Sequence, residues 1–396
     1  MNQSKPTSPV SQLFTDFFNS EKAGGLLLLV ATIVSLVIAN SVNGQAFVHF
    51  WHQKLNLSFS IIELNYSIEH WINDGLMTIF FLLVGLEIER ELYKGELSNF
   101  KNAIVPIVAA IGGMAVPALF HFLLNNRTDT QGGVGIPMAT DIAFALGMLS
   151  LLGKKVPVSL KIFLTALAII DDLGAITVIA IFYSKGISLA YLLGAAGIFI
   201  LLMAFQKLRV YKLIFYIIPG ILLWYCMLKS GIHATIAGVL LAFAIPFGKN
   251  DENNPSYKLQ HWLHKPVAFL LLPFFALANT ALLFNPGWQD QLQSNNSIGI
   301  IAGLFLGKPL GILLATLLLV KMKWGSLPEG SSYMQIIGVG FMAGIGFTMS
   351  IFISNLAFTD NAIIQNSKIA VLAGSVLSAI AGLLLLYIFG RKKSIN

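Results

Sequence analysis

Two adjacent carboxylates stand in the middle of the apolar run Pro157-Val-Ser-Leu-Lys-Ile-Phe-Leu-Thr-Ala-Leu-Ala-Ile-Ile-Asp-Asp-Leu-Gly-Ala-Ile-Thr-Val-Ile-Ala-Ile-Phe-Tyr183. At about 1.5 Å per helical residue, Asp171 lies roughly 21 Å beyond Pro157, which is near mid-bilayer if the run crosses a membrane. A carboxylate at that depth costs about 3 kcal/mol, and the neighbouring Asp172 adds repulsion. The pair therefore requires a compensating partner, and a charged ligand is the first candidate.

The composition is that of a multi-span membrane protein. Of the 396 residues, 56% are hydrophobic and only 11% are charged, and the mean hydropathy is +0.77. Apolar stretches with the length of one helical crossing recur from Ala23 to Gly390, which predicts an all-α membrane protein of about twelve spans. The expected spans are 22–41, 68–92, 103–124, 133–151, 157–183, 187–206, 212–228, 231–247, 263–284, 297–319, 332–357 and 364–390.

The positive charges predict the orientation of these spans. With both termini inside, most of the 25 lysines and arginines fall in inner segments. The outer residues are Lys54, Arg127, Lys185, Lys229 and Lys368, and Lys308 lies within a span. This bias follows the positive-inside rule, so the net charge of +7 reflects topology and does not indicate nucleic-acid binding.

Two polar segments lie outside the predicted spans. Residues 1–21 are expected to form a cytoplasmic N-terminal segment. Residues 44–67 are too polar to cross, and the alternation in Leu55-Asn-Leu-Ser-Phe-Ser-Ile-Ile-Glu-Leu-Asn65 predicts an outer β-hairpin. Such a hairpin could pair with its twin in a second protomer.

Two spans are interrupted by helix-breaking residues. Gly132-Gly-Val-Gly-Ile-Pro-Met-Ala-Thr-Asp-Ile-Ala-Phe144 carries glycines, a proline and an aspartate, and Gly338-Val-Gly-Phe-Met-Ala-Gly-Ile-Gly-Phe-Thr348 carries four glycines. Paired broken helices mark the ion or substrate site in transporters built from inverted repeats, because the loose helix ends expose backbone groups. The alternative is that the glycines only permit close helix packing.

The buried charges can be weighed one by one. Asp171 and Asp172 point about 100° apart around a helix, so one can bind an ion while the other faces a partner. Two neighbouring carboxylates in a low dielectric are not expected to be ionised together when empty, so a proton competes with a cation for the same oxygens. Lys308 is too deep to reach the surface and needs a carboxylate or helix C-terminal carbonyls, with Asp171 the simplest partner. A structural pairing of the acids is the alternative.

Thr140 and Asp141 follow Pro137 in the first interrupted span, and two interpretations stay open. The hydroxyl and the carboxylate could ligate an alkali cation, or the carboxylate could neutralise positive helix N-termini that meet there. We prefer the second, because unpaired helix ends at that depth need compensation whatever the substrate is.

A further charged group is expected at the inner surface: Glu87, Glu89, Arg90, Glu91, His261 and His264. A solvated rim of ion pairs is the default interpretation, and a response to cytoplasmic pH is the alternative. His233, near an outer helix end, is expected to be structural, and spacing assigns no role to Asp74.

The residues also carry a resemblance. Ala139-Thr-Asp-Ile-Ala-Phe-Ala-Leu-Gly147, Ala168-Ile-Ile-Asp-Asp-Leu-Gly-Ala175, Gly307-Lys-Pro-Leu-Gly311 and Gly344-Ile-Gly-Phe-Thr-Met-Ser-Ile-Phe-Ile353 resemble the signatures of the bacterial Na⁺/H⁺ antiporter NhaA family. Phe80-Phe-Leu-Leu-Val-Gly-Leu-Glu-Ile88 and Gly231-Ile-His-Ala-Thr-Ile-Ala-Gly238 agree as well. The likeness runs in order over nearly the whole chain.

This resemblance implies a twelve-helix inner-membrane protein with inverted repeats, for which 103–183 and 297–390 are the candidate core. It implies that Asp171 and Asp172 bind Na⁺ or Li⁺ in exchange for protons, that Lys308 pairs with Asp171, and that Asp141 and Lys308 offset the facing helix ends. It also implies electrogenic exchange, activation at alkaline pH and a homodimer joined through the hairpin. The family's pH-response positions carry over to Glu87, Arg90, His261 and His264, and Gln260 departs from an acidic position of that cluster.

The sequence therefore predicts a secondary antiporter that exports Na⁺ or Li⁺ and imports protons by alternating access, without a cofactor. It is not expected to be an enzyme, and no phosphate-binding Gly-x-x-x-x-Gly-Lys-Ser/Thr loop is present. Two other classes remain. An intramembrane aspartyl protease would need two carboxyls that share one water from facing helices, which leaves Asp141 with Asp172 as a pair. A passive cation channel would give the buried Lys308 no purpose.

Overall fold

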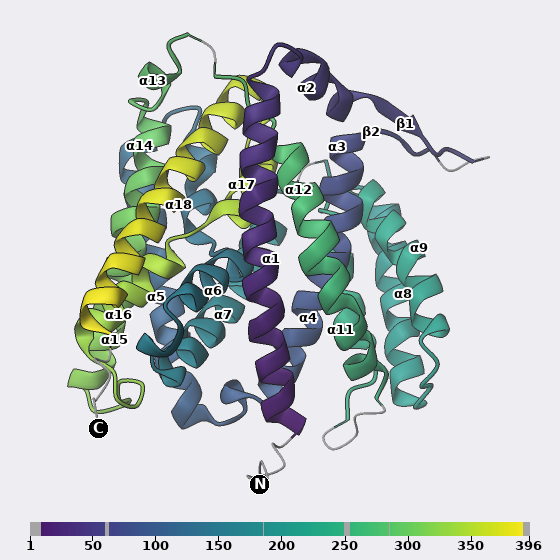
Figure 1. Ribbon diagram of the computed structural model, residues 1–396. Coiled ribbons are helices and arrows are strands. Elements are labelled where there is room, and N and C mark those ends of the chain that lie inside the picture. The colour runs from purple at the N-terminus through teal and green to yellow at the C-terminus, as the bar shows by residue number, and fades with distance from the viewer. Residues whose placement is uncertain (1–8, 60–62, 185, 249–253, 285, 391–396) are drawn as a thin grey trace, which may run out of the picture.

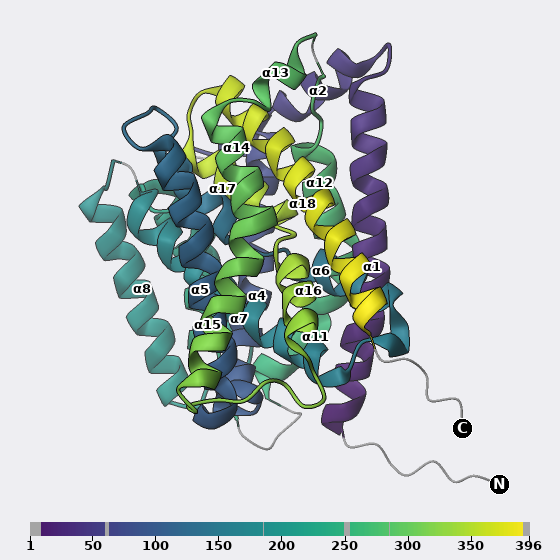
Figure 2. The ribbon, with the colours of Figure 1, turned by 90° about the vertical axis from the view of Figure 1, so that its left-hand side faces the viewer.

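The structure is a computed structural model, and it describes residues 9–59, 63–184, 186–248, 254–284 and 286–390. Most helices of the bundle run between its two ends, and a small β-hairpin stands at one of them (Figures 1 and 2). At the other end α1 (Pro9–Ala39) begins and α18 (Asn361–Phe389) finishes. We call these the hairpin end and the terminal end.

The all-α membrane-protein class predicted from the sequence is confirmed. In the part of the chain described, nine helices are long and apolar enough to cross a membrane, or up to ten if α16 (Tyr333–Ala343) and α17 (Phe347–Ala357) count as one bent span. Two other apolar helices are shorter, α9 (Ile214–Ser230) with 17 residues and α10 (Ile236–Ala244) with 9. Each predicted span overlaps a helix, and the number twelve stays a prediction.

The remaining elements complete the bundle, with η marking 3₁₀ or π segments. In chain order they are α2 (Gly44–His52), β1 (Lys54–Asn56), β2 (Asn65–Ser67), α3 (Ile68–His70), η1 (Trp71–Leu76), α4 (Met77–Tyr93), η2 (Glu96–Ser98), α5 (Phe100–Asn125), η3 (Gln131–Met138), α6 (Ile142–Leu151), η4 (Gly153–Lys155), α7 (Val158–Phe182), α8 (Leu189–Lys207), α11 (Pro255–Pro266), η5 (Val267–Leu271), α12 (Leu272–Asn279), α13 (Trp288–Gln291), α14 (Asn295–Ala302), η6 (Gly303–Gly307) and α15 (Lys308–Lys321).

The segment 44–67 is only partly the hairpin that its alternation predicts. β1 and β2 pair antiparallel with Lys54 opposite Ser67, and residues 60–62 of the loop lie outside the described residues. Residues 44–52, in contrast, form the helix α2, so the prediction of a hairpin over all of 44–67 is wrong for this part. The physical reason is the spacing of its aromatic rings: Phe47 and Trp51 lie one helical turn apart and pack edge to face at 5.7 Å.

Two other boundaries differ from the hydropathy prediction. α1 begins at Pro9, within the predicted N-terminal segment 1–21, of which residues 1–8 lie outside the described residues. The span predicted at 263–284 runs instead from Pro255 to Asn279 through α11, η5 and α12. Both helices begin before the apolar window, because hydropathy marks only the lipid-spanning part of a helix and not the turns that extend beyond the hydrocarbon core.

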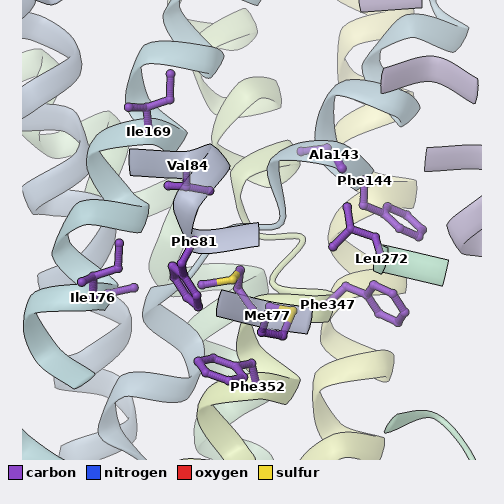
Figure 3. Packing of buried hydrophobic residues seen from close by; sticks show 14 of the residues in the cluster. Met77, Phe81, Val84, Ala143, Phe144, Ile169, Ile176, Leu272, Phe347 and Phe352 are labelled. Atoms are coloured by element: carbon purple, nitrogen blue, oxygen red, sulfur yellow. The ribbon is translucent and has the colours of Figure 1, made fainter. Parts of the chain in front are cut away.

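Aromatic side chains fill the centre of the bundle around the interrupted helices (Figure 3). The rings of Phe144 on α6 and Phe347 on α17 lie 5.3 Å apart, and those of Phe81 on α4 and Phe352 on α17 lie 5.5 Å apart. All four residues are buried. The two interrupted helices are therefore held in a closely packed apolar surrounding, in which any charge has few partners available.

Candidate functional site

Both interruptions predicted from glycine and proline are present. The first span begins as η3, is extended at Ala139 with φ −80° and ψ 151°, and resumes as α6 after Asp141. The second is bent by 48° between α16 and α17, across Gly344, Ile345 and Gly346. The prediction that both spans are broken helices is confirmed.

The two breaks cross and bond to each other directly. The Asp141 amide donates to the Ile345 carbonyl at 2.7 Å, and the Thr140 hydroxyl donates to the Ala343 carbonyl at 2.7 Å. Glycine also lets the second break approach the neighbouring segment η6, because a Cβ on Gly344 would stand 2.3 Å from the Leu304 carbonyl oxygen. A larger residue at this position would push the backbones apart.

Asp141 caps two helices at once. Its Oδ1 accepts from the Phe144 amide of α6 at 2.9 Å, and its Oδ2 accepts from the Thr348 amide of α17 at 3.0 Å and from the Thr348 hydroxyl at 2.5 Å. The first amides of a helix have no partner within it and form the positive end of the helix dipole. A single buried carboxylate thus faces the N-termini of both interrupted helices.

We predict that Asp141→Ala lowers the thermal stability of the purified protein much more than removal of an ordinary helix cap. Three buried donors would lose their acceptor, at about 1 to 3 kcal/mol each. The control is Asp360→Ala, because Asp360 is an exposed cap whose side chain accepts from the Ala362 amide of α18, and its loss costs about 1 kcal/mol. Equal melting temperatures for the two variants in detergent would show that Asp141 does not hold the crossing.

Asp171 and Asp172 lie on α7, which passes the crossing as an unbroken helix of 25 residues. Both side chains are completely buried, as is Lys308. Lys308 follows the π segment η6 on the neighbouring α15 span. The widened turn has a local cause, since Pro309 has no amide hydrogen and its ring clashes with the carbonyl one turn earlier.

The Lys308 ammonium joins α7 to the crossing. Its Nζ lies 2.6 Å from Asp171 Oδ2 and also donates to the Met138 carbonyl at the end of η3. A cation at the C-terminal end of a helix opposes the negative end of its dipole. In the same crossing, Asp141 therefore faces helix N-termini and Lys308 faces a helix C-terminus.

Asp172 differs from its neighbour. Among the described residues, neither of its carboxylate oxygens has a hydrogen-bond partner, and the same is true of Asp171 Oδ1. An unpartnered carboxylate in a buried, apolar place is stable only when it carries a proton or meets a cation. Three such oxygens on two adjacent residues are hard ligands of the kind that alkali cations prefer, and they can equally hold protons.

The group expected at the inner surface is not a solvated rim. Glu87 and Glu89 on α4 are 7% and 4% exposed, so that interpretation is wrong for these two residues. Glu87 Oε1 lies 4.0 Å from His264 Nδ1. Arg90 bonds to Glu91 at 3.3 Å, and His261 is exposed while Gln260 is buried beside it on α11.

A small cavity of about 40 Å³ connects this group with the crossing. It is lined by Glu87 and His264 together with Asp141 and Thr348. The four side chains come from α4, α11, α17 and the residue that precedes α6. The structure thus brings two of the pH-response candidates close to the interrupted helices, while Arg90 and His261 do not line this cavity.

Two other polar residues lie apart from the crossing. His233 Nε2 lies 3.1 Å from the Tyr183 carbonyl, and Asp74 pairs with His70 at 3.2 Å at the hairpin end. Thr348 was not singled out from the sequence, although it is a direct partner of Asp141. The sequence feature that could have identified Thr348 is a hydroxyl in the first turn after a glycine-rich break, because a helix N-terminus at such a position attracts an anion.

Comparison with known proteins agrees with this geometry. The profile of the family Na⁺/H⁺ antiporter 1 matches residues 15–386. A protein of Cytophaga hutchinsonii named Na(+)/H(+) antiporter NhaA is 57% identical over 375 residues, which cover 95% of each chain. A protein of the same name from Dechloromonas aromatica is 57% identical over 384 residues, covering 96% of this chain and 97% of the relative. One from Helicobacter acinonychis is 42% identical and covers all of both chains.

The identities are high and extend over almost the full length, and the matched region contains both interrupted helices, α7 and Lys308. The chain therefore belongs to the Na⁺/H⁺ antiporter 1 family.

Proposed function

We propose that this protein exchanges Na⁺ or Li⁺ for protons across the bacterial inner membrane, with Asp172 as the main ion ligand and proton carrier. The observation that carries the proposal is the pair of unpartnered Asp172 oxygens, buried beside the Asp171–Lys308 ion pair. Because the same oxygens can hold a proton or a cation, binding of one displaces the other. That competition is the chemistry that an exchanger requires.

In the proposed cycle, protons loaded from outside leave toward the cytoplasm, and Na⁺ binds the freed carboxylates of Asp171 and Asp172. Asp171 is shared between the ion and Lys308, and Thr140 supports the site from the neighbouring break. Rearrangement of a core formed by 103–183 and 297–390 then exposes the site outward. In both halves of this core an interrupted helix stands between two long ones, which supports an inverted repeat. Only differences in affinity drive the cycle, so it needs no resident cofactor.

The terminal end is proposed to face the cytoplasm, as the distribution of positive charge indicates. Glu87 and His264 would then connect cytoplasmic pH to the crossing through the cavity that they share with Asp141, and Arg90 and His261 would act from its rim. The hairpin, with Leu55, Leu57 and Phe59 exposed, would join two protomers. Exchange with this dependence on pH would regulate intracellular sodium and pH.

The geometry favours an exchanger over the two other classes. Asp141 cannot share a water with Asp172 as a protease dyad does, since its carboxylate is engaged by the amides of α6 and α17. A passive channel would not place the ammonium of Lys308 against a carboxylate of its cation pathway.

Everted membrane vesicles test the proposal. An acid interior is established and followed with a pH-sensitive dye, and NaCl, LiCl or KCl is then added. We expect Na⁺ and Li⁺ to collapse the gradient, more at alkaline than at acidic pH, and K⁺ to have little effect. Vesicles without the protein are the control. If neither Na⁺ nor Li⁺ collapses the gradient at any pH from weakly acidic to alkaline, the protein is not such an exchanger.

A further inference from the structure

Lys368 is a second buried lysine, at the hairpin end of the bundle. It lies on α18 and is 5% exposed, although the sequence placed it among the outer surface lysines. Its Nζ lies 3.3 Å from Glu69 Oε1 and 3.3 Å from the side-chain oxygen of Asn279. A lysine this buried needs such oxygens, and all of them come from outside the candidate core.

Amide side chains extend this contact. Asn355 on α17 donates to Asn279 on α12 at 2.7 Å, and Asn279 in turn donates to Asn73 on η1 at 2.7 Å. The core thus supplies the donors Lys368 and Asn355, and the rest of the bundle supplies the acceptors. Asn355 lies on the same interrupted helix as Thr348, which bonds to Asp141, so a displacement of α17 at the crossing would reach this network.

The network lines a cavity. A cavity of about 350 Å³ opens at the hairpin end and is lined by Glu69, Asn73, Asn279, Asn355 and Lys368 among others. None of its lining residues is Asp141, Asp171, Asp172 or Lys308. The small cavity lined by Glu87 and His264, in contrast, includes Asp141. Asn355 lies beyond Thr348 on α17, and α17 runs from the crossing toward the hairpin end, so the network stands on the hairpin-end side of the crossing.

We propose that Lys368 and Asn355, bonded to Glu69 and Asn279, form the outer gate of the exchanger, which must separate before the site can open toward the hairpin end. This inference rests on the proposed exchange function. A gate of charged and amide groups suits the task, because each group regains hydrogen bonds from water when the contact opens. The network therefore holds the gate closed in this structure, and the protein can still reach the conformation in which the gate is open.

A cleavable cross-link tests the gate. In a Cys226→Ser background, Glu69→Cys/Lys368→Cys is linked with a disulfide-containing bis-maleimide whose length matches the lost contact, and exchange is measured before linking, after it and after reduction. We expect exchange before linking, no exchange after linking, and recovery of exchange after reduction. The matched control is His52→Cys/Glu69→Cys, since His52 and Glu69 also pair at 3.2 Å but both lie outside the core. Its link should leave exchange intact.

The outcomes separate the gate from the function. Full exchange in the linked Glu69→Cys/Lys368→Cys protein, with the link verified by mass, would overturn the gate and leave the exchange function standing. No exchange in the parent protein would instead contradict the proposed function.

An accessibility measurement tests the gate without ion transport. Ser350 is buried at the crossing and donates to the Ile136 carbonyl, so Ser350→Cys in the Cys226→Ser background reports on access to it. We expect Lys368→Met to speed its labelling by an impermeant maleimide from the hairpin side about tenfold, the shift expected for loss of a hydrogen bond to a charged group. His70→Gln removes the contact between His70 and Asp74, which both lie outside the core, and should leave the rate unchanged. Equal rates in all three proteins would refute the gate.

Discussion

Asp172→Asn is expected to abolish Na⁺- and Li⁺-dependent proton exchange. An amide keeps the size of the side chain but removes the charge, and a unit charge near the ion is worth about 4 kcal/mol in a protein environment, or about three decades in cation affinity. Asparagine also has no carboxyl proton to release. The variant should therefore lose both halves of the exchange, with no response of the dye in everted vesicles.

The matched control is Asp360→Asn, which changes an aspartate at an exposed helix cap and should keep full exchange. Asp172→Glu keeps the charge and should retain part of the activity with a changed affinity for Na⁺. If Asp172→Asn exchanged Na⁺ at the normal rate, the ion would bind elsewhere, and the site proposed here would be wrong even if the function were right.

Lys308→Met is expected to lower the stability of the protein strongly. Asp171 Oδ2 and the Met138 carbonyl would both lose their buried donor. Removing one partner of a buried ion pair typically costs about 3 to 5 kcal/mol, because a charge is left without compensation. The melting temperature of the purified protein in detergent should therefore fall clearly below that of Lys321→Met, which changes an exposed lysine at the far end of the same helix.

A double variant identifies the cause. If the loss comes from the uncompensated charge, Asp171→Asn/Lys308→Met should recover most of the stability that Lys308→Met loses, since no buried charge of the pair remains. Additive losses in the double variant would show that Lys308 acts through packing alone. Recovery of stability without recovery of exchange would separate the structural role of this ion pair from the binding of the cation.

Much of the architecture could be predicted from patterns along the chain. The predicted span 157–183 forms one long helix, α7 (Val158–Phe182), because its apolar length matches a membrane crossing, and the two breaks occur where glycine and proline weaken a helix. These are local properties, so neighbouring residues suffice to indicate them. In residues 44–52 the polar composition favoured an outer hairpin, but the aromatic residues are spaced one helical turn apart. A helix formed there in place of the predicted hairpin.

Burial was less predictable than secondary structure. Glu87, Glu89 and Lys368 look like surface charges in the sequence, because each stands near the end of an apolar run. The structure buries all three, since helices from distant parts of the chain cover them. Hydropathy measures the preference of a segment for lipid and contains no information on which neighbour will lie against a given side.

The sequence by itself determined that this chain forms a helical membrane protein, that two of its spans are interrupted, and that Asp171, Asp172 and Lys308 lie too deep to be solvated. Only the tertiary structure decided which of these groups meet. Lys308 and Asp171 are 137 positions apart, and Thr348 and Asp141 are 207 apart. Their contacts depend on how whole helices pack, and this packing leaves the oxygens of Asp172 without a partner among the described residues.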